Sequence, residues 1–320
     1  MIDRIVGKIK KVASFGQVVI AFSGGEDSAL VSRLASLALG TENVELVHVC
    51  FGPYGYSKGL ENAIAVASEL GLALKIVPGR TVQERILRNG PACNMCTRVA
   101  KLGVVKAYAG GRLVLSGANK SDTWGQMGLE LHNGVYSPLF ELEKDEIREM
   151  LESLQLEVPR IGESSYREGC KLKHLLKPLV NPNYHGHAAA VANEVLLDTL
   201  DEVGWRVRIA NVKIVGPLSK NVGLVNVDPI PPKAVKKLVL ERLSCVRTLD
   251  EVLWVEGKIK LKVMANPGLF SDTNARYWVE EGRIGRDFAE EVELEWHRSS
   301  NKRLRTFHVV EAIEAGRIAV

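Results

Sequence analysis

Apolar residues in the first half of the chain follow two alternating spacings. Short runs rich in β-branched residues predict buried strands, at residues 17–22, 44–50, 73–77 and 112–116. Between these runs apolar residues recur every three or four positions, which predicts helices at residues 1–12, 27–39, 57–70, 82–87, 97–109 and 143–154. Strands that alternate with helices in this way form βαβ units around a mainly parallel sheet. The pattern therefore predicts an α/β domain of the Rossmann-like type.

The spacing changes after residue 204, where a helix predicted for residues 188–203 ends. Beyond it, alternating apolar and polar positions predict strands within residues 206–216, 223–232, 251–265 and 289–296, with one helix at 233–243. We therefore predict two domains, residues 1–204 and residues 205–320. The second is expected to be an α+β unit rich in strands that serves substrate binding or formation of a homodimer.

Composition adds limits to this picture. The 320 residues are 46% hydrophobic and 25% charged, as in an ordinary globular protein. No run approaches the ~18 apolar residues of a membrane span, and the N-terminus lacks the apolar core and cleavage site of a secretory signal. We therefore expect a cytoplasmic protein with no membrane partner. The formal net charge of +4, with the basic excess after residue 205, permits a nucleic-acid partner without demonstrating one.

The first predicted strand joins the following helix through a tight turn, in the segment VVIAFSGGEDSAL at residues 18–30. Gly24 and Gly25 allow the backbone to turn sharply and to approach a ligand closely. Ser23, Asp27 and Ser28 place oxygens at the start of the helix, where unpaired N–H groups and the helix dipole favour an anion. The residues therefore predict a phosphate-binding strand–loop–helix, with a plain βα turn as the alternative.

Two further segments should lie at the same edge of the sheet, since ligands of parallel sheets bind outside the carboxyl ends of the strands. One follows Cys50 and the other follows Ser116. The second reads GANKSD, residues 117–122. Taken alone, this sequence is typical of an ordinary turn that contains Gly and Asn.

The segment SGGEDS at residues 23–28 resembles the SGGxDS signature of the PP-loop ATP pyrophosphatases, whose domain has the adenine nucleotide alpha hydrolase-like (HUP) fold. GANKSD is similar to the TGxNxDD loop of the sulfur transferases in that superfamily; Gly117, Asn119 and Asp122 match, while Ser121 replaces an Asp and leaves metal binding there in doubt. The resemblance implies ATP and Mg²⁺ as ligands, Asp27 and Asp122 as catalytic residues, and a set of nucleotide-binding residues: Ala21, Ser23, Gly24, Gly25, Asp27, Ser28, His48 and Gly117.

The five cysteines are too few, and odd in number, for a secreted disulfide framework. Cys93 and Cys96 form a CxxC before a predicted helix, and Cys170 is the one credible third ligand. Residue spacing leaves zinc and an iron–sulfur cluster open, whereas a redox dithiol would need a thioredoxin-like context. Cys50 and Cys245 are expected to be buried small hydrophobic residues.

The three cysteines are similar in order to those of PP-loop tRNA thiolases that hold a 4Fe-4S cluster. This likeness implies a sulfur transferase: ATP adenylates a carbonyl oxygen of a tRNA base, pyrophosphate leaves, and sulfur from sulfide or a carrier protein displaces AMP. A basic residue beside the CxxC would assist, either Arg98 or Lys101; we choose Lys101. The alternatives are a PP-loop ligase that forms an amide or amine, and a nucleotide-binding module without catalysis.

Overall fold

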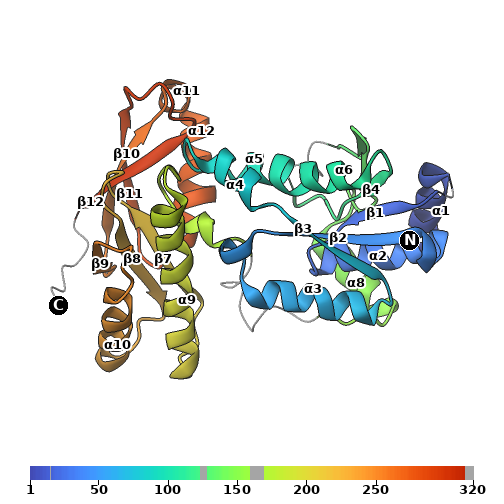
Figure 1. Ribbon diagram of the computed structural model, residues 1–320, viewed down its shortest axis with the longest axis horizontal. Helices are drawn as coiled ribbons and strands as arrows, with labels where there is room; N and C mark the ends of the chain where they lie inside the picture. Colours follow the sequence, from blue (N-terminus) through green and yellow to red (C-terminus); the bar gives the residue numbers. More distant parts are fainter. Residues whose placement is uncertain (15, 123–127, 159–168, 314–320) are drawn as a thin grey trace. The chain divides into compact units, whose positions relative to one another are not determined.

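A computed structural model describes residues 1–14, 16–122, 128–158 and 169–313 (Figure 1). Contacts divide the chain into two units. Unit 1 consists of Met1–Val82 and Thr97–Glu168, and unit 2 consists of Gln83–Cys96 and Gly169–Val320. The domain boundary predicted at residue 204 falls inside unit 2, which also takes in a short segment from the first third of the chain.

Unit 1 is built on a six-stranded sheet in the order β3-β2-β1-β4-β6-β5. Every neighbouring pair is parallel except β5 and β6. This arrangement confirms the predicted Rossmann-like parallel sheet. The strands are β1 (Val18–Ala21), β2 (Val44–Cys50), β3 (Ala73–Pro78), β4 (Leu113–Leu115), β5 (Leu131–His132) and β6 (Val135–Tyr136).

Helices cover both faces of this sheet, so its central strands are apolar on both sides, as parallel sheets require (Figure 1). Val18 and Ile20 of β1 pack in one apolar cluster, and Val19 packs in the cluster on the opposite face. The first cluster is completed by α1 (Ile2–Ala13), α2 (Glu26–Leu39), α3 (Ser57–Glu69) and α8 (Lys144–Ser153). The second is completed by α6 (Gly103–Ala109).

The order in which successive strands are added to the sheet changes direction at β1. From β1 the chain moves outward through β2 to β3, and it then returns to place β4 on the other side of β1. The loops that follow β1 and β4 are therefore neighbours at the carboxyl edge of the sheet. In open α/β sheets this switch point is where ligands bind.

Two local features of unit 1 differ from the sequence predictions. The helix predicted for residues 97–109 is a π-helix over Cys96–Leu102 and becomes α-helical only in α6. The hairpin of β5 and β6 was not predicted, although Asn133 and Gly134 form its turn with φ of 51° and 76°. Asn-Gly is the strongest short hairpin signal, but two-residue strands leave no apolar alternation to accompany it.

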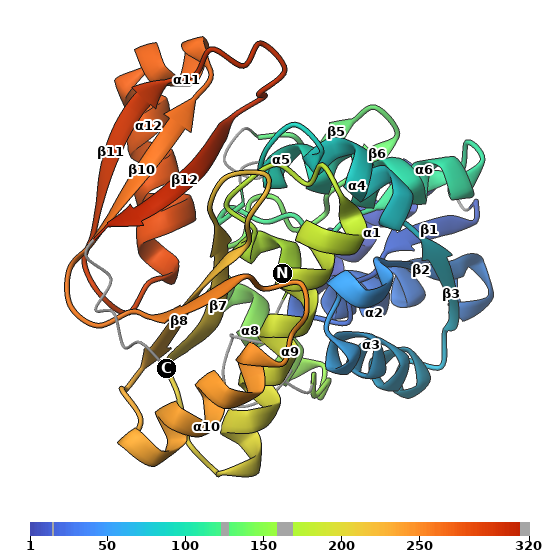
Figure 2. The same cartoon turned by 60° about the vertical axis from the view of Figure 1, so that its left-hand side comes forward.

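Unit 2 contains two three-stranded sheets, which confirms the expected strand-rich C-terminal region (Figure 2). In the first sheet, β8 pairs antiparallel with β7 and parallel with β9. Helix α9 contacts β7, and helix α10 contacts β9. The bounds are β7 (Ile209–Val215), β8 (Val222–Asp228), β9 (Glu251–Trp254), α9 (His187–Glu202) and α10 (Lys233–Ser244). The run predicted at residues 251–265 breaks at Gly257, whose φ is 75°.

The second sheet has the order β11-β10-β12, with β11 parallel and β12 antiparallel to β10. Its bounds are β10 (Ile259–Ala265), β11 (Val292–Arg298) and β12 (Phe307–Ile313), and the crossover from β10 to β11 contains α11 (Pro267–Ser271) and α12 (Thr273–Val279). Leu176 joins the two sheets, because its N–H donates to Ile214 and its carbonyl accepts from Val309. Strand β12 was not among the predicted strands.

The part of the chain that the structure describes contains no helix long and apolar enough to cross a membrane.

Candidate functional site

The loop after β1 is held by contacts that only glycine allows at position 24. Gly24 has a φ of 82°, and a Cβ there would lie 2.6 Å from the Cα of Ala63. Asn62 fixes the same turn, because its Nδ2 donates to the carbonyl oxygen of Gly24 at 2.8 Å. Sequence reasoning missed Asn62, since nothing in its own helix marks it as a support for a distant loop.

The serine hydroxyls of the loop face each other. The Oγ atoms of Ser23 and Ser28 are 3.1 Å apart, and the N–H of Gly25 donates to Ser23 Oγ at 3.3 Å. Helix α2 begins directly after Gly25, and no side chain caps its first turn. The first N–H groups of an uncapped helix need acceptors from elsewhere. This strand–loop–helix therefore offers a phosphate group both donors and a favourable dipole.

The loop after β4 contacts the start of α2. A Cβ at Gly117 would lie 2.9 Å from Asp27 Cβ, so a larger residue would push the two segments apart. Asn119 is fully buried and accepts from the N–H of Ser121 through Oδ1, while its Nδ2 has no partner. Asp122 accepts from the N–H of Asn119 at 3.1 Å. A buried donor without an acceptor, beside the loop at residues 23–28, fits a ligand that supplies an oxygen or ring nitrogen.

Asp27 is the charged centre of this arrangement. Burial raises its pKa; the ammonium of Lys144 opposes this shift, while Asp122 and Glu26 add to it. Lys144 Nζ contacts both carboxylate oxygens of Asp27. Sequence reasoning assigned Lys144 no role, because its partner lies 117 residues earlier in the chain.

His48 and Lys101 lie near each other in unit 1. His48, on β2, contacts the carbonyl oxygen of Phe22 through Nδ1 at 3.1 Å. Burial lowers the pKa of His48, and the charge of Lys101 lowers it further. The imidazole is therefore neutral, with its proton on Nδ1, and Nε2 is left as an acceptor. Ala21, the last residue of β1, precedes Phe22 and carries no polar side chain.

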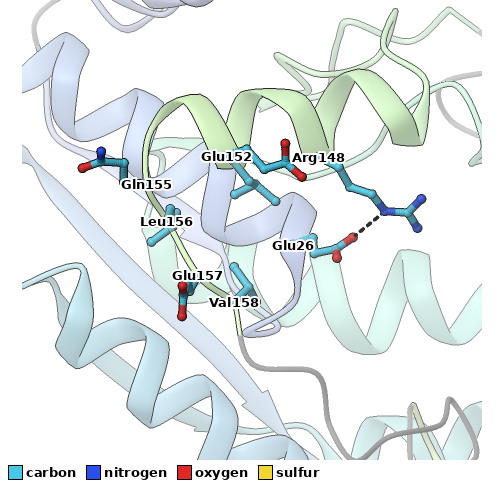
Figure 3. Close-up of a pocket in the computed structure, with 8 residues that line it drawn as sticks. Glu26, Arg148, Glu152, Gln155, Leu156, Glu157 and Val158 are labelled. Atoms are coloured by element: carbon cyan, nitrogen blue, oxygen red, sulfur yellow. Dashed lines mark ion pairs between the residues drawn. The ribbon is translucent and has the colours of Figure 1, made fainter.

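A pocket of about 480 Å³ opens beside the start of α2 (Figure 3). Glu26 and Arg148 form an ion pair of 3.7 Å across it. The carboxylates outnumber the single guanidinium among the lining residues, which are Glu26, Arg148, Leu151, Glu152, Gln155, Leu156, Glu157 and Val158. An acidic lining does not suit phosphates, so the pocket is distinct in chemistry from the loop beside it.

The three predicted metal ligands all belong to unit 2. Gln83 brings two of them together, since its Nε2 lies 3.1 Å from Cys170 Sγ and 3.6 Å from Cys96 Sγ. Cys93 is exposed. Among the described residues no group of three His, Cys, Asp or Glu side chains could hold a metal ion.

The expectation that Cys50 and Cys245 are buried is wrong. Cys50 is half-buried at the end of β2, and Cys245 is exposed at the end of α10. Both lie where an element ends, and side chains at the ends of strands and helices are less covered than those at their centres.

The fold is that of an α/β protein, and the family match places it in the PP-loop ATP pyrophosphatase superfamily. The profile of the family described as NAD synthase matches residues 1–161, half of the chain. The chain therefore belongs to the NAD synthase family.

Individual relatives agree with this placement. The chain is 32% identical over 166 residues to the NH3-dependent NAD+ synthetase of Pyrococcus furiosus, and 30% identical over 173 residues to that of Chlorobaculum tepidum. These matches cover 47% and 50% of this chain and 61% of each relative, so the chain spans about three fifths of the length of these curated relatives. A shorter match, 36% over 73 residues, covers 23% of this chain and 13% of the glutamine-dependent NAD+ synthetase of Synechocystis sp..

Among solved structures, the NH3-dependent NAD synthetase of Campylobacter jejuni in complex with the nitrate ion matches with a TM-score of 0.40 and 22% identity. The match covers 49% of this chain and 72% of that one.

The predicted sulfur transferase is wrong, and with it the tRNA acceptor, the sulfur donor and the 4Fe-4S cluster, because the matching relatives are NAD+ synthetases. The resemblance assigns the SGGxDS loop to nucleotide binding, which is the part of the reaction that all branches of the superfamily share. The choice of branch depended on the likeness of GANKSD to the sulfur transferase loop and, above all, on the spacing of Cys93, Cys96 and Cys170. Spacing shows which residues follow one another, not whether three thiolates surround one point.

Proposed function

We propose that unit 1 binds ATP at residues 23–28 and 117–122 and uses it to convert a carboxylate into an amide. The carboxylate attacks the α-phosphorus of ATP, so that an acyl adenylate forms and pyrophosphate leaves. Ammonia then attacks the acyl carbon, and AMP departs as a good leaving group. This is the reaction class of an NH3-dependent NAD+ synthetase, the name that several relatives carry. The carboxylate would then belong to the acid form of NAD.

The observation that carries this proposal is the convergence of the two loops on one side of Asp27. The uncapped N–H groups at the start of α2 would bind phosphate oxygens. Asn119 Nδ2, a buried donor without a partner, would bind the nucleotide from the side of the second loop. Lys144 lies close enough to Asp27 to hold it in place and to offset phosphate charge nearby.

The carboxylates of Asp27 and Asp122 fit Mg²⁺, because proteins hold this ion through one or two carboxylates together with substrate phosphates. The two groups are near enough for the charge of Asp122 to raise the pKa of Asp27. A bound Mg²⁺ would neutralise phosphate charge. Lys144 opposes the rise in the pKa of Asp27 that burial causes, and so favours the ionised carboxylate that would bind such an ion.

Release of pyrophosphate and AMP from ATP is the direct test, measured with ammonium and the acid form of NAD and then with each omitted. Asp27→Asn should abolish release, whereas Asp145→Asn, a matched change at an exposed residue of α8, should not. Pyrophosphate release without any carboxylate, or unchanged release in Asp27→Asn, would contradict the proposal. ATP binding without turnover on any carboxylate would indicate a nucleotide-binding module instead.

A further inference from the structure

Unit 2 contains a second cluster of charged groups that the proposed reaction does not use. Lys213 on β7 has 0% of its side chain exposed, and His174, in the short turn Lys171–His174, is 2% exposed. Lys213 Nζ lies 3.2 Å from His174 Nδ1 and 2.9 Å from Asp287 Oδ2. The buried ammonium of Lys213 therefore bridges a buried histidine and a carboxylate.

The hydrogen-bond pattern determines the tautomer of His174. Burial lowers the pKa of Lys213 to about 8, so this group is mainly an ammonium at neutral pH and can only donate. His174 Nδ1 must then accept, and its proton lies on Nε2. Nε2 is buried and has no hydrogen-bond partner. The imidazole therefore presents a buried N–H donor without an acceptor.

Arg283 adds two more such donors. Its Nε and Nη2 atoms are buried, and neither has a partner. Its charge, like that of Lys173, lowers the pKa of both His174 and Asp287. Leaving a buried donor unpaired costs about 1–3 kcal/mol, and more for charged groups. Arg283 acts electrostatically on both His174 and Asp287, and the three unpaired donors of this cluster indicate that an acceptor belongs among them.

The cluster is held in a fixed arrangement. Asn211 and Asn226 each donate through Nδ2 to the backbone oxygen of Asp287, at 2.9 and 2.6 Å. Asn226 Oδ1 also accepts from the N–H of Ala289 at 2.7 Å. Side chains from β7 and β8 therefore fix the segment that supplies Asp287. A fixed site loses little conformational freedom when a ligand binds.

We infer that this cluster binds a phosphate-type dianion, either inorganic phosphate or the terminal phosphate of a small ester. The charges favour a dianion over a carboxylate: three cationic side chains, Lys213, Arg283 and Lys173, face one carboxylate, that of Asp287, which leaves a formal charge of +2. The unpaired donors of His174 and Arg283 would bind its oxygens. This inference does not depend on the reaction proposed for unit 1.

Titration of the full-length protein with inorganic phosphate, followed by calorimetry and by phosphorus NMR, tests the inference. Arg283→Met should weaken this binding about tenfold or more, because charge-assisted hydrogen bonds are lost. Arg303→Met, a matched change at an exposed arginine, should leave it unaltered. Phosphate bound by the loop of unit 1 would persist in Arg283→Met and weaken in Ser28→Ala, so the two sites can be told apart.

The remaining outcomes decide the nature of the ligand. Saturation by inorganic phosphate identifies the free anion, while tighter binding of glycerol phosphate identifies an ester as the ligand; both support the inference. Equal affinity for acetate and phosphate would overturn it, and so would the absence of a phosphate event sensitive to Arg283→Met. If Arg283→Met fails to fold, the titration of the wild-type protein still tests the inference. No binding of phosphate at millimolar concentration would overturn it.

Discussion

The ammonium nitrogen of Lys144 lies 2.6 and 2.5 Å from the two carboxylate oxygens of Asp27. It thereby joins the start of α8 to the start of α2. A lysine with both carboxylate oxygens in reach keeps Asp27 ionised in a place where burial works against the charge. Removing the ammonium of Lys144 should therefore change the pH at which Asp27 loses its charge.

Lys144→Met should move the acidic limb of the rate of pyrophosphate release to higher pH. Lys144 lowers the pKa of Asp27 against the effect of burial, so its loss lets that pKa rise, and Asp27 loses its charge at a higher pH than before. The pH profile of the variant should therefore show a larger loss of activity below neutrality than above it. Lys8→Met is the matched control, because Lys8 is equally exposed and pairs only with Glu130 and Glu141 among the described residues. An unshifted limb in Lys144→Met would contradict the pairing.

Gly24→Ala should destabilise unit 1 and weaken ATP binding. The new Cβ would meet the backbone of Ala63 at 2.6 Å, in addition to the strain of a φ of 82°. Gly71→Ala is a close control, since Gly71 has a φ of 64° and open space around its Cβ position. In Gly71→Ala we expect the backbone strain alone to lower the free energy of unfolding by about 1 kcal/mol. In Gly24→Ala the free energy of unfolding should fall clearly further. Chemical denaturation measures both, and equal losses would show that the contact with Ala63 is unimportant.

Asn119→Asp should weaken ATP binding about tenfold or more, and it should also lower the unfolding midpoint, because the new carboxylate is fully buried. The carboxylate keeps the oxygen that accepts from Ser121 and removes the Nδ2 donor. Its negative charge would also repel phosphate. Asn133→Asp adds the same charge in an exposed hairpin turn and should leave ATP affinity unchanged. Equal affinity in Asn119→Asp and wild type, measured by calorimetry, would remove Asn119 from the site.

Unit 2 should lose stability as the pH falls from about 6.5 towards 4. Burial lowers the pKa of His308 from 6.5 to about 4, so the folded protein binds the proton less readily than the unfolded chain does. The stability present above pH 6.5 is lost through this window, on the order of 3 kcal/mol from this residue. His308→Gln should flatten the dependence of the unfolding free energy on pH, whereas the exposed His187→Gln should not. An identical slope in His308→Gln would show that His308 is accessible to protons in the folded state.

Sequence reasoning predicted the parallel sheet well because buried central strands carry continuous apolar runs. Strand β2 has the predicted bounds, and α2 begins one residue earlier than predicted. The loops at residues 23–28 and 117–122 were recognised because glycine and capping residues mark a turn locally. Lys144 and Asn62 were missed because their function lies in a contact with a residue far away in the chain.

The branch of the superfamily could not be inferred from the same signals. The proposed roles of Ser23, Gly24 and Asp27 concern the nucleotide, and a nucleotide is common to amidation and to sulfur transfer. The cysteines were taken as deciding between the two, but their positions in the chain do not tell whether their sulfur atoms meet. In the folded protein a single amide, that of Gln83, lies between two of them.

The segment Gln83–Cys96 has a consequence for the order in which the protein forms during synthesis. It belongs to unit 2, and its backbone carbonyls at Ile86 and Pro91 accept hydrogen bonds from Arg305 and Thr306, which lie 219 and 215 residues later. The ribosome therefore synthesises this segment long before it synthesises Arg305 and Thr306. Because contacts between distant residues form slowly, unit 2 must complete its fold only after the last strand has been made, and the nascent chain has to keep residues 83–96 available until then.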